Sequence, residues 1–236
     1  LYLESLGHHI IDLVPGLIGL KGKQSFFADI AGIRADVKVD LYIESTHACS
    51  EQGELQLTNY GISGIPVFQL SRVATRALSE QKKVYATLNF VPLWEKEQCL
   101  TYFKERFKKA DEKHIGEALI GFFPEKLIPV LLEESHIKAA KYANRLQTEE
   151  LERFIDTVQG LRVDITDWNT FDTAQVTAGG VDTDEIDAET MESKLCPGLY
   201  FAGEMVDIDG ICGGYNLQWA WSSGAVAGIH VARELS

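Results

Sequence analysis

The sequence predicts a fold that mixes α/β and α+β organisation, and three observations predict it. Leu199–Ala202 is an unbroken apolar run followed by a glycine-rich loop and a long helical pattern, which is typical of a buried strand leading into a helix. Alternating apolar and polar residues between positions 22 and 94 indicate half-buried antiparallel strands. A helical period dominates residues 95–160. The chain therefore combines a strand–loop–helix unit with a β-rich part and a helical part.

The first segment, residues 1–20, begins as a piece of amphipathic helix and reaches a turn at Pro15 and Gly16. His8 and His9 are adjacent, so on a helix their side chains would point to different sides. The two histidines are therefore not expected to share a metal ion. Ordinary packing or surface roles are expected for them.

Three strand candidates follow. Ala35–Glu44 alternates cleanly, with its apolar residues at odd positions. Glu54–Thr58 repeats the alternation after a polar turn at residues 50–53, which predicts a hairpin. Val84–Phe90 is the third candidate.

A Gly-Ile-Ser-Gly sequence lies between these strands at Gly61–Gly64, and Pro66 follows it at a typical first helical position. The helix is expected to reach about Leu78. The glycine segment is interpreted as a strand-to-helix turn. A loop that binds an anion or faces a substrate is the alternative.

Apolar stripes at helical spacing mark the region 95–160. Pro124 is expected to begin one helix and Pro129 to kink or shorten it. Another helix is expected from an N-cap at Thr148 to a stop at Gly160. Leu161–Asp167 then alternates again and is expected to rejoin the strands.

The glycine-rich loop ahead of the last helix is the clearest candidate site. Glycine permits positive φ and a close approach of backbone to a ligand, and the first amides of a helix remain free to donate to an electron-rich group. Asn216 is the expected N-cap of that helix. A tight connection that binds no ligand explains the same glycines equally well.

The strings VTAGGV, TMESK, GLYFAGE and GGYN-x-Q-WA-x-SSG occur in this order within residues 176–224. Together with LTNYGISGIPVFQLS at 57–71 and LVPGLIGL at 13–20, they resemble the C-terminal part of the BaiN-type and aminoacetone-oxidase-like family of FAD-dependent oxidoreductases. That family is similar to the wider group of flavoproteins with two dinucleotide-binding domains.

The resemblance implies three regions. Residues 1–22 and 176–236 are the C-terminal part of the FAD-binding domain, 23–94 and 161–175 an inserted β-rich, barrel-like domain, and 95–160 a helical insertion. The family's G-x-G-x-x-G turn, which takes the FAD pyrophosphate, does not occur here. We therefore expect a fragment of the FAD domain without its N-terminal segment. Leu199–Ala202 should then be poorly covered, or shielded by another chain in an oligomer.

The resemblance also implies where FAD binds, without a covalent bond. Gly179 and Gly180 form a turn close to the flavin, and Glu204, beside Gly203, contacts the ribityl or ribose region unless it caps its own loop. The other implied cofactor-binding residues begin the last helix: Gly213, Gly214, Tyr215, Asn216 and Leu217.

The chemistry expected from this family is an oxidoreductase reaction on a small organic substrate, with NAD(P)H as a candidate electron donor. No catalytic residue can be named, and Tyr60, Tyr215 and His47 are candidates by residue type only. Trp219 and Trp221 lie two apart on a helix, so they cannot face the same way. A folded module that binds no FAD by itself, or a protein-interaction module, is the alternative function.

Composition and charge limit the partners and the compartment that we expect for this protein. The 236 residues carry a net charge of −13, which argues against nucleic acid or an anionic membrane as a partner. No apolar run approaches the roughly 20 residues that span a bilayer. The four cysteines show no C-x-x-C spacing, so a metal site is not expected. Isolated cysteines are typical of a reducing compartment, and a location in the cytoplasm is expected.

Overall fold

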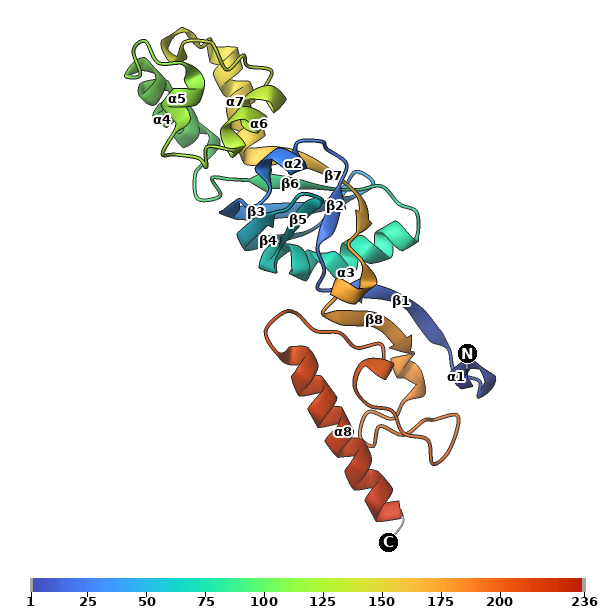
Figure 1. Ribbon diagram of the computed structural model, residues 1–236. Coiled ribbons are helices and arrows are strands. Elements are labelled where there is room, and N and C mark those ends of the chain that lie inside the picture. The colour runs from blue at the N-terminus through green and yellow to red at the C-terminus, as the bar shows by residue number, and fades with distance from the viewer. Residues whose placement is uncertain (1, 235–236) are drawn as a thin grey trace.

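The computed structural model describes residues 2–234, which form three parts in a row (Figure 1). A group of helices lies at one end, a closed β-barrel in the middle, and a two-stranded sheet with the long helix α8 at the other end. Among the described residues, no helix has both the length and the apolar character that crossing a bilayer requires.

The barrel consists of six antiparallel strands, which confirms the barrel-like expectation. Its order is β2-β5-β4-β3-β6-β7, and β7 pairs with β2 to close it. The strands are β2 (Leu20–Gly22), β3 (Arg34–Ile43), β4 (Thr46–Leu57), β5 (Gly61–Gly64), β6 (Val84–Asn89) and β7 (Leu161–Trp168). The short helix α2 (Phe27–Ile30) lies between β2 and β3. The alternating residues Val37, Val39 and Leu41 are fully buried inside.

The β3–β4 hairpin is longer than the sequence predicts, because its turn lies at Glu44 and Ser45. Glu44 has a φ of 56°, and residues 50–53, expected to form the turn, pair with β3 instead. The first eight residues of β4 are half-buried or exposed. They carry polar residues without apolar alternation, so this half of the strand resembles a turn in the sequence.

The expected turn at Gly61–Gly64 is also a strand, β5, and this corrects the sequence interpretation. Both glycines lie against neighbouring backbone: a Cβ on Gly61 would be 2.2 Å from the Leu20 carbonyl oxygen, and one on Gly64 2.6 Å from that of Glu54. Glycine therefore allows β5 to pair between β2 and β4. Helix α3 (Ile65–Ser79) follows with Pro66 in its first turn, as predicted.

The helical part contains α4 (Lys96–Lys108), α5 (Ile115–Leu119), α6 (Leu127–Glu134), the 3-10 turn η1 (Ala143–Arg145) and α7 (Thr148–Gly160). Thr148 is the first helical residue rather than the cap, which is Gln147. Helix α6 begins at Leu127 rather than Pro124, so Pro129 falls in its first turn, where proline is tolerated. Rings of Phe103, Phe107 and Phe154 form the centre of this part.

The C-terminal part is built on β1 (Ile10–Gly16) and β8 (Val176–Val181), which pair antiparallel. Helix α8 (Tyr215–Glu234) follows a long irregular segment. The remaining short elements are α1 (Tyr2–Ser5), η2 (Phe171–Thr173), η3 (Thr183–Glu185) and η4 (Gly203–Met205).

His8 and His9 lie beyond the end of α1, not on a helix. The buried His8 ring lies between Glu185, whose Oε2 is 2.8 Å from Nδ1, and Ser193, whose Oγ is 3.0 Å from Nε2. His8 thus ties the N-terminal segment to the loops after β8, which is the packing role that the sequence predicts.

Leu199–Ala202 is not the buried strand that its apolar run suggests. Among the described residues it makes one isolated bridge, between Tyr200 and Glu192, with backbone hydrogen bonds from Ser193 to Leu199 and from Phe201 to Met191. Phe201 is buried, whereas the other three residues are half-buried. A strand needs a hydrogen-bonded neighbour on at least one edge, and the described residues supply no continuous one. Phe201 nevertheless packs in the small core of the C-terminal part, so the expectation of a poorly covered segment is met only in part.

Candidate functional site

The five glycines that the sequence singled out all have left-handed backbone. Their φ values are 105° at Gly179, 134° at Gly180, 66° at Gly203, 131° at Gly213 and 92° at Gly214. Residues with a side chain adopt such angles at an energetic cost, so glycine is the favoured residue at each position.

Gly179 and Gly180 are required by contacts within the protein. A Cβ on Gly179 would lie 2.4 Å from the Asp12 carbonyl oxygen, and one on Gly180 would lie 2.6 Å from that of Met205. The turn at the end of β8 therefore packs directly against β1 and η4.

Helix α8 fixes the backbone of Gly203. The Trp219 indole Nε1 donates to the Gly203 carbonyl oxygen at 3.0 Å, and the Gly203 N–H donates to Ser223 Oγ at 2.9 Å. The neighbouring Glu204 accepts from the Thr177 N–H at 3.2 Å. Glu204 thus joins η4 to β8, and it is exposed.

Asn216 does not act as the N-cap of α8, because it lies inside the first turn. Its amide bonds to Gly210 twice: Oδ1 accepts from the Gly210 N–H at 2.7 Å, and Nδ2 donates to the Gly210 carbonyl oxygen at 3.0 Å. The capping prediction was wrong because this side chain folds back onto the preceding loop and shapes it.

The start of α8 is open. Within residues 2–234, the backbone N–H groups of Tyr215, Asn216 and Leu217 have no hydrogen-bond acceptor, and the first turn contains no acidic residue. A Cβ on Gly214 would meet no atom within 4 Å. This end of the helix therefore offers donors and a positive dipole end to an approaching group.

The two acidic residues of the loop are paired with arginines of α3. Arg76 Nη2 lies 3.2 Å from Asp207 Oδ1, and Arg72 Nη1 lies 2.8 Å from Asp209 Oδ1. Because both carboxylates have cationic partners, they repel an anionic or electron-rich ligand less strongly than bare carboxylates would.

The structure divides the predicted site residues into two groups. Gly180 and Glu204 line a largely apolar groove of about 410 Å³ beside β1 and β8, together with Leu13, Thr177 and Met205. Residues 213–217 do not line that groove. The two groups are connected through Gly203, which α8 holds from the other side.

The two tryptophans of α8 differ in exposure, as their spacing predicts. Trp219 is half-buried against Gly203, whereas Trp221 is 68% exposed. Tyr215 and Leu217 are also exposed. Trp219 therefore has a packing role, and the outer face of α8 presents apolar side chains.

The other candidates by residue type lie on the barrel. Tyr60 follows β4 and its hydroxyl lies close to Gly19. His47 on β4 is 2.8 Å from Ser50 Oγ and 3.4 Å from the Asp40 carboxylate. Burial raises the pKa of Asp40, but hydrogen bonds from Lys38, Ser50 and His47 outweigh it and hold that pKa below its usual value. These groups form a network on the barrel surface.

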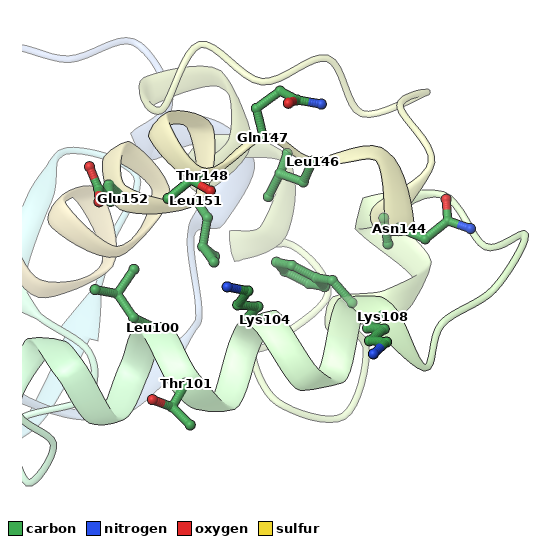
Figure 2. Close-up of a pocket in the computed structure, with 12 residues that line it drawn as sticks. Leu100, Thr101, Lys104, Lys108, Asn144, Leu146, Gln147, Thr148, Leu151 and Glu152 are labelled. Carbon is green, nitrogen blue, oxygen red and sulfur yellow. The ribbon is translucent and has the colours of Figure 1, made fainter.

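A pocket that the sequence did not indicate lies between α4 and α7 (Figure 2). It has a volume of about 440 Å³, and Figure 2 shows Leu100 and Leu151 lining it with Lys104 and Lys108 nearby. None of the predicted site residues lines it, and Figure 1 places the helical part at the opposite end from α8. In the part of the chain described, no group of three His, Cys, Asp or Glu side chains is arranged to hold a metal ion.

Known proteins similar to this chain include a reductase and two ribosomal RNA dihydrouridine synthases, by their names. The chain is 44% identical to the 3-dehydro-bile acid delta(4,6)-reductase of Clostridium scindens over 225 residues, which are 95% of this chain and 55% of that protein. It is 29% identical to the ribosomal RNA dihydrouridine synthase of Escherichia coli, over 93% of this chain and 52% of that protein. The synthase of the same name from Haemophilus influenzae is 30% identical, over 83% of this chain and 47% of that protein.

The chain spans about half the length of these curated relatives. A family model described as the HI0933-like protein Rossmann domain matches residues 2–230. The chain therefore belongs to the HI0933-like family, which confirms its resemblance to the BaiN-type oxidoreductases.

Proposed function

We propose that the chain is part of a flavin-dependent oxidoreductase that holds FAD without a covalent bond and acts on a small organic substrate in the cytoplasm. The observation that carries the proposal is the identity of 44%, across nearly the whole chain, to a protein named as a reductase. NAD(P)H is the candidate electron donor.

The residues at the start of α8 fit a flavin. Three backbone donors that have no acceptor within residues 2–234, and the open space at Gly214, allow an electron-rich ring edge to approach the backbone closely. Bound FAD would supply the electron transfer itself. The proposed roles of the chain's own residues are to donate from Tyr215, Asn216 and Leu217, and to line the adjoining groove with Gly180 and Glu204.

The choice of substrate class rests on charge. Two of the relatives are named for a reaction on ribosomal RNA. A net charge of −13 disfavours a polyanionic substrate, because binding nucleic acid depends on Lys and Arg contacts to phosphates. A small organic substrate is therefore the better proposal for this chain.

A second candidate is a folded module that binds no FAD alone. It is favoured by the outer face of α8, where Leu217, Trp221 and Ile229 are each more than half exposed. In this case an N-terminal FAD-binding segment of the intact protein, or a second copy of the chain, covers the face.

A titration with FAD tests the proposal. The purified chain is expected to show a flavin absorbance band after excess FAD is removed, and its tryptophan fluorescence is expected to fall saturably as FAD is added. Gly214→Ala should weaken binding by about tenfold, equivalent to roughly 1.4 kcal/mol, because its methyl group enters the space through which the ligand approaches.

Gly121→Ala is the matched control. Gly121 has a φ of 82°, and a Cβ there would also meet no atom within 4 Å, but it lies in the helical part. Equal loss of FAD binding in both variants would show that Gly214 acts only through backbone strain. Cooperative unfolding without any FAD binding would support the second candidate.

A further inference from the structure

Helix α3 has three different faces. Its apolar side chains, including Val67, Leu70 and Ala74, are buried in the barrel core. On an adjoining face, the buried Thr75 donates to the Pro15 carbonyl oxygen at 3.0 Å, and the buried Ser71 accepts from the Ile18 N–H at 3.2 Å. The helix is therefore fixed to both the barrel and the end of β1.

The third face consists of Gln69, Arg72 and Arg76, which we call the α3 contact face. Positions 69, 72 and 76 are spaced by three and four residues, so they lie on one side of the helix. All three side chains contact the segment 207–212, which lies more than 130 residues further along the chain. Figure 1 shows α3 between the barrel and the C-terminal part.

Each contact fixes a different point of the glycine loop. Gln69 Oε1 accepts from the Cys212 N–H at 2.9 Å, directly ahead of Gly213. Arg72 pairs with Asp209, whose side chain is only 8% exposed. Arg76 pairs with Asp207 Oδ1, and that same oxygen accepts from the Gly179 N–H at 2.9 Å.

The Asp207 contact joins the two groups of predicted site residues. Asp207 lies in the loop that leads to α8, and Gly179 lies in the turn at the end of β8. Arg76 orients the carboxylate that connects them. Hydrogen bonds to charged groups are stronger than those between neutral groups, so this network constrains the loop more than the Asn216–Gly210 bonds alone.

We propose that Gln69, Arg72 and Arg76 are positioning residues that set the geometry of the flavin-binding loop from the barrel domain. The predicted effect of these residues on FAD rests on the proposed function. Their predicted effect on the order of the loop does not. Arg72 and Arg76 have a second effect, because they neutralise two carboxylates next to the flavin site. Their loss should make the flavin harder to reduce, since reduction adds negative charge.

Hydrogen exchange of the chain without FAD provides the first test. Arg76→Met should raise the exchange rate of the Gly179 amide, and Gln69→Leu that of the Cys212 amide, each by roughly tenfold or more, because these amides lose an oriented acceptor. Arg34→Met is the matched control. Arg34 pairs with Glu54 on the barrel surface, where both side chains are more than half exposed, and its loss should leave both amides unchanged.

The second test is made with FAD added. Arg72→Met and Arg76→Met are expected to lower the reduction potential of the bound flavin, and Arg72→Lys and Arg76→Lys to restore most of it by returning the positive charge. Unchanged exchange at residues 179 and 212 would overturn the positioning role. Faster exchange in a chain that binds no FAD would support the positioning role and contradict the proposed function instead.

Discussion

At the scale of single residues, the glycines of the C-terminal part differ in how closely neighbouring backbone packs against them. Gly180 has a φ of 134°, and a Cβ there would lie 2.6 Å from the Met205 carbonyl oxygen. Gly180→Ala is therefore expected to destabilise the fold by about 1–3 kcal/mol, because backbone strain and an atomic overlap are added together. Urea unfolding monitored by circular dichroism would measure this.

The control is Gly160→Ala at the end of α7. A Cβ at Gly160 would meet no atom within 4 Å, so the change should alter stability by less than about 1 kcal/mol. If Gly180→Ala lowered the free energy of unfolding by as little as Gly160→Ala, β8 would not pack against η4 as closely as described.

Other residue contacts lay beyond what the sequence could predict. The glycine-rich loop ahead of α8 was expected to allow positive φ, and Gly213 and Gly214 have it. The contact of His8 with Glu185 and Ser193 spans more than 170 residues, and no local pattern encodes it. The pairing of Arg72 and Arg76 with the acidic loop was missed for the same reason.

At the scale of elements, the N-terminus of α7 makes the stability of the helical part depend on pH. Glu150 accepts from the Gln147 N–H at 2.8 Å and from Lys141 at 2.7 Å. The Lys141 side chain, followed by that amide, lowers the pKa of Glu150 from its ordinary 4.5. The ionised form is thus favoured by folding, so its contribution is complete above about pH 4.5 and is lost as the pH falls through the lower folded pKa.

Glu150→Gln is accordingly expected to cost about 1 kcal/mol at pH 7 and little near pH 2. Urea unfolding of both proteins at the two pH values gives the comparison. Glu149→Gln, one residue earlier in the same first turn, should have a smaller effect, because it removes a charge near the helix dipole without removing these hydrogen bonds. A difference that persisted at low pH would argue against the carboxylate as its source.

Elements were predictable where side chains alternate or recur without interruption. β3, β6, β7, α3 and the apolar stripe of α7 follow directly from such patterns. The errors fall where another force dominates: β5 is a strand because glycines let backbones pair closely, and the first half of β4 is polar because it is not covered. Leu199–Ala202 has the composition of a strand but no continuous neighbour to pair with.

At the scale of the whole molecule, the described residues form two hydrophobic cores of unequal size. One core runs continuously through the barrel and the helical part, whereas the C-terminal part has a small one around Val181, Phe201 and Val206. Because stabilisation grows with the apolar area buried, the C-terminal part should open at a lower free energy than the barrel.

The tryptophans report on this difference. Trp219 and Trp221 lie on α8, whereas Trp94 and Trp168 are partly buried and pack against the large core. In a variant with Trp94→Phe and Trp168→Phe, the remaining fluorescence is expected to change at a lower urea concentration than the circular dichroism of the whole chain. Ligand that binds only the folded loop should move the first transition upward and leave the second nearly in place. A single transition by both probes would mean that the α3 contact face couples the two cores into one cooperative unit.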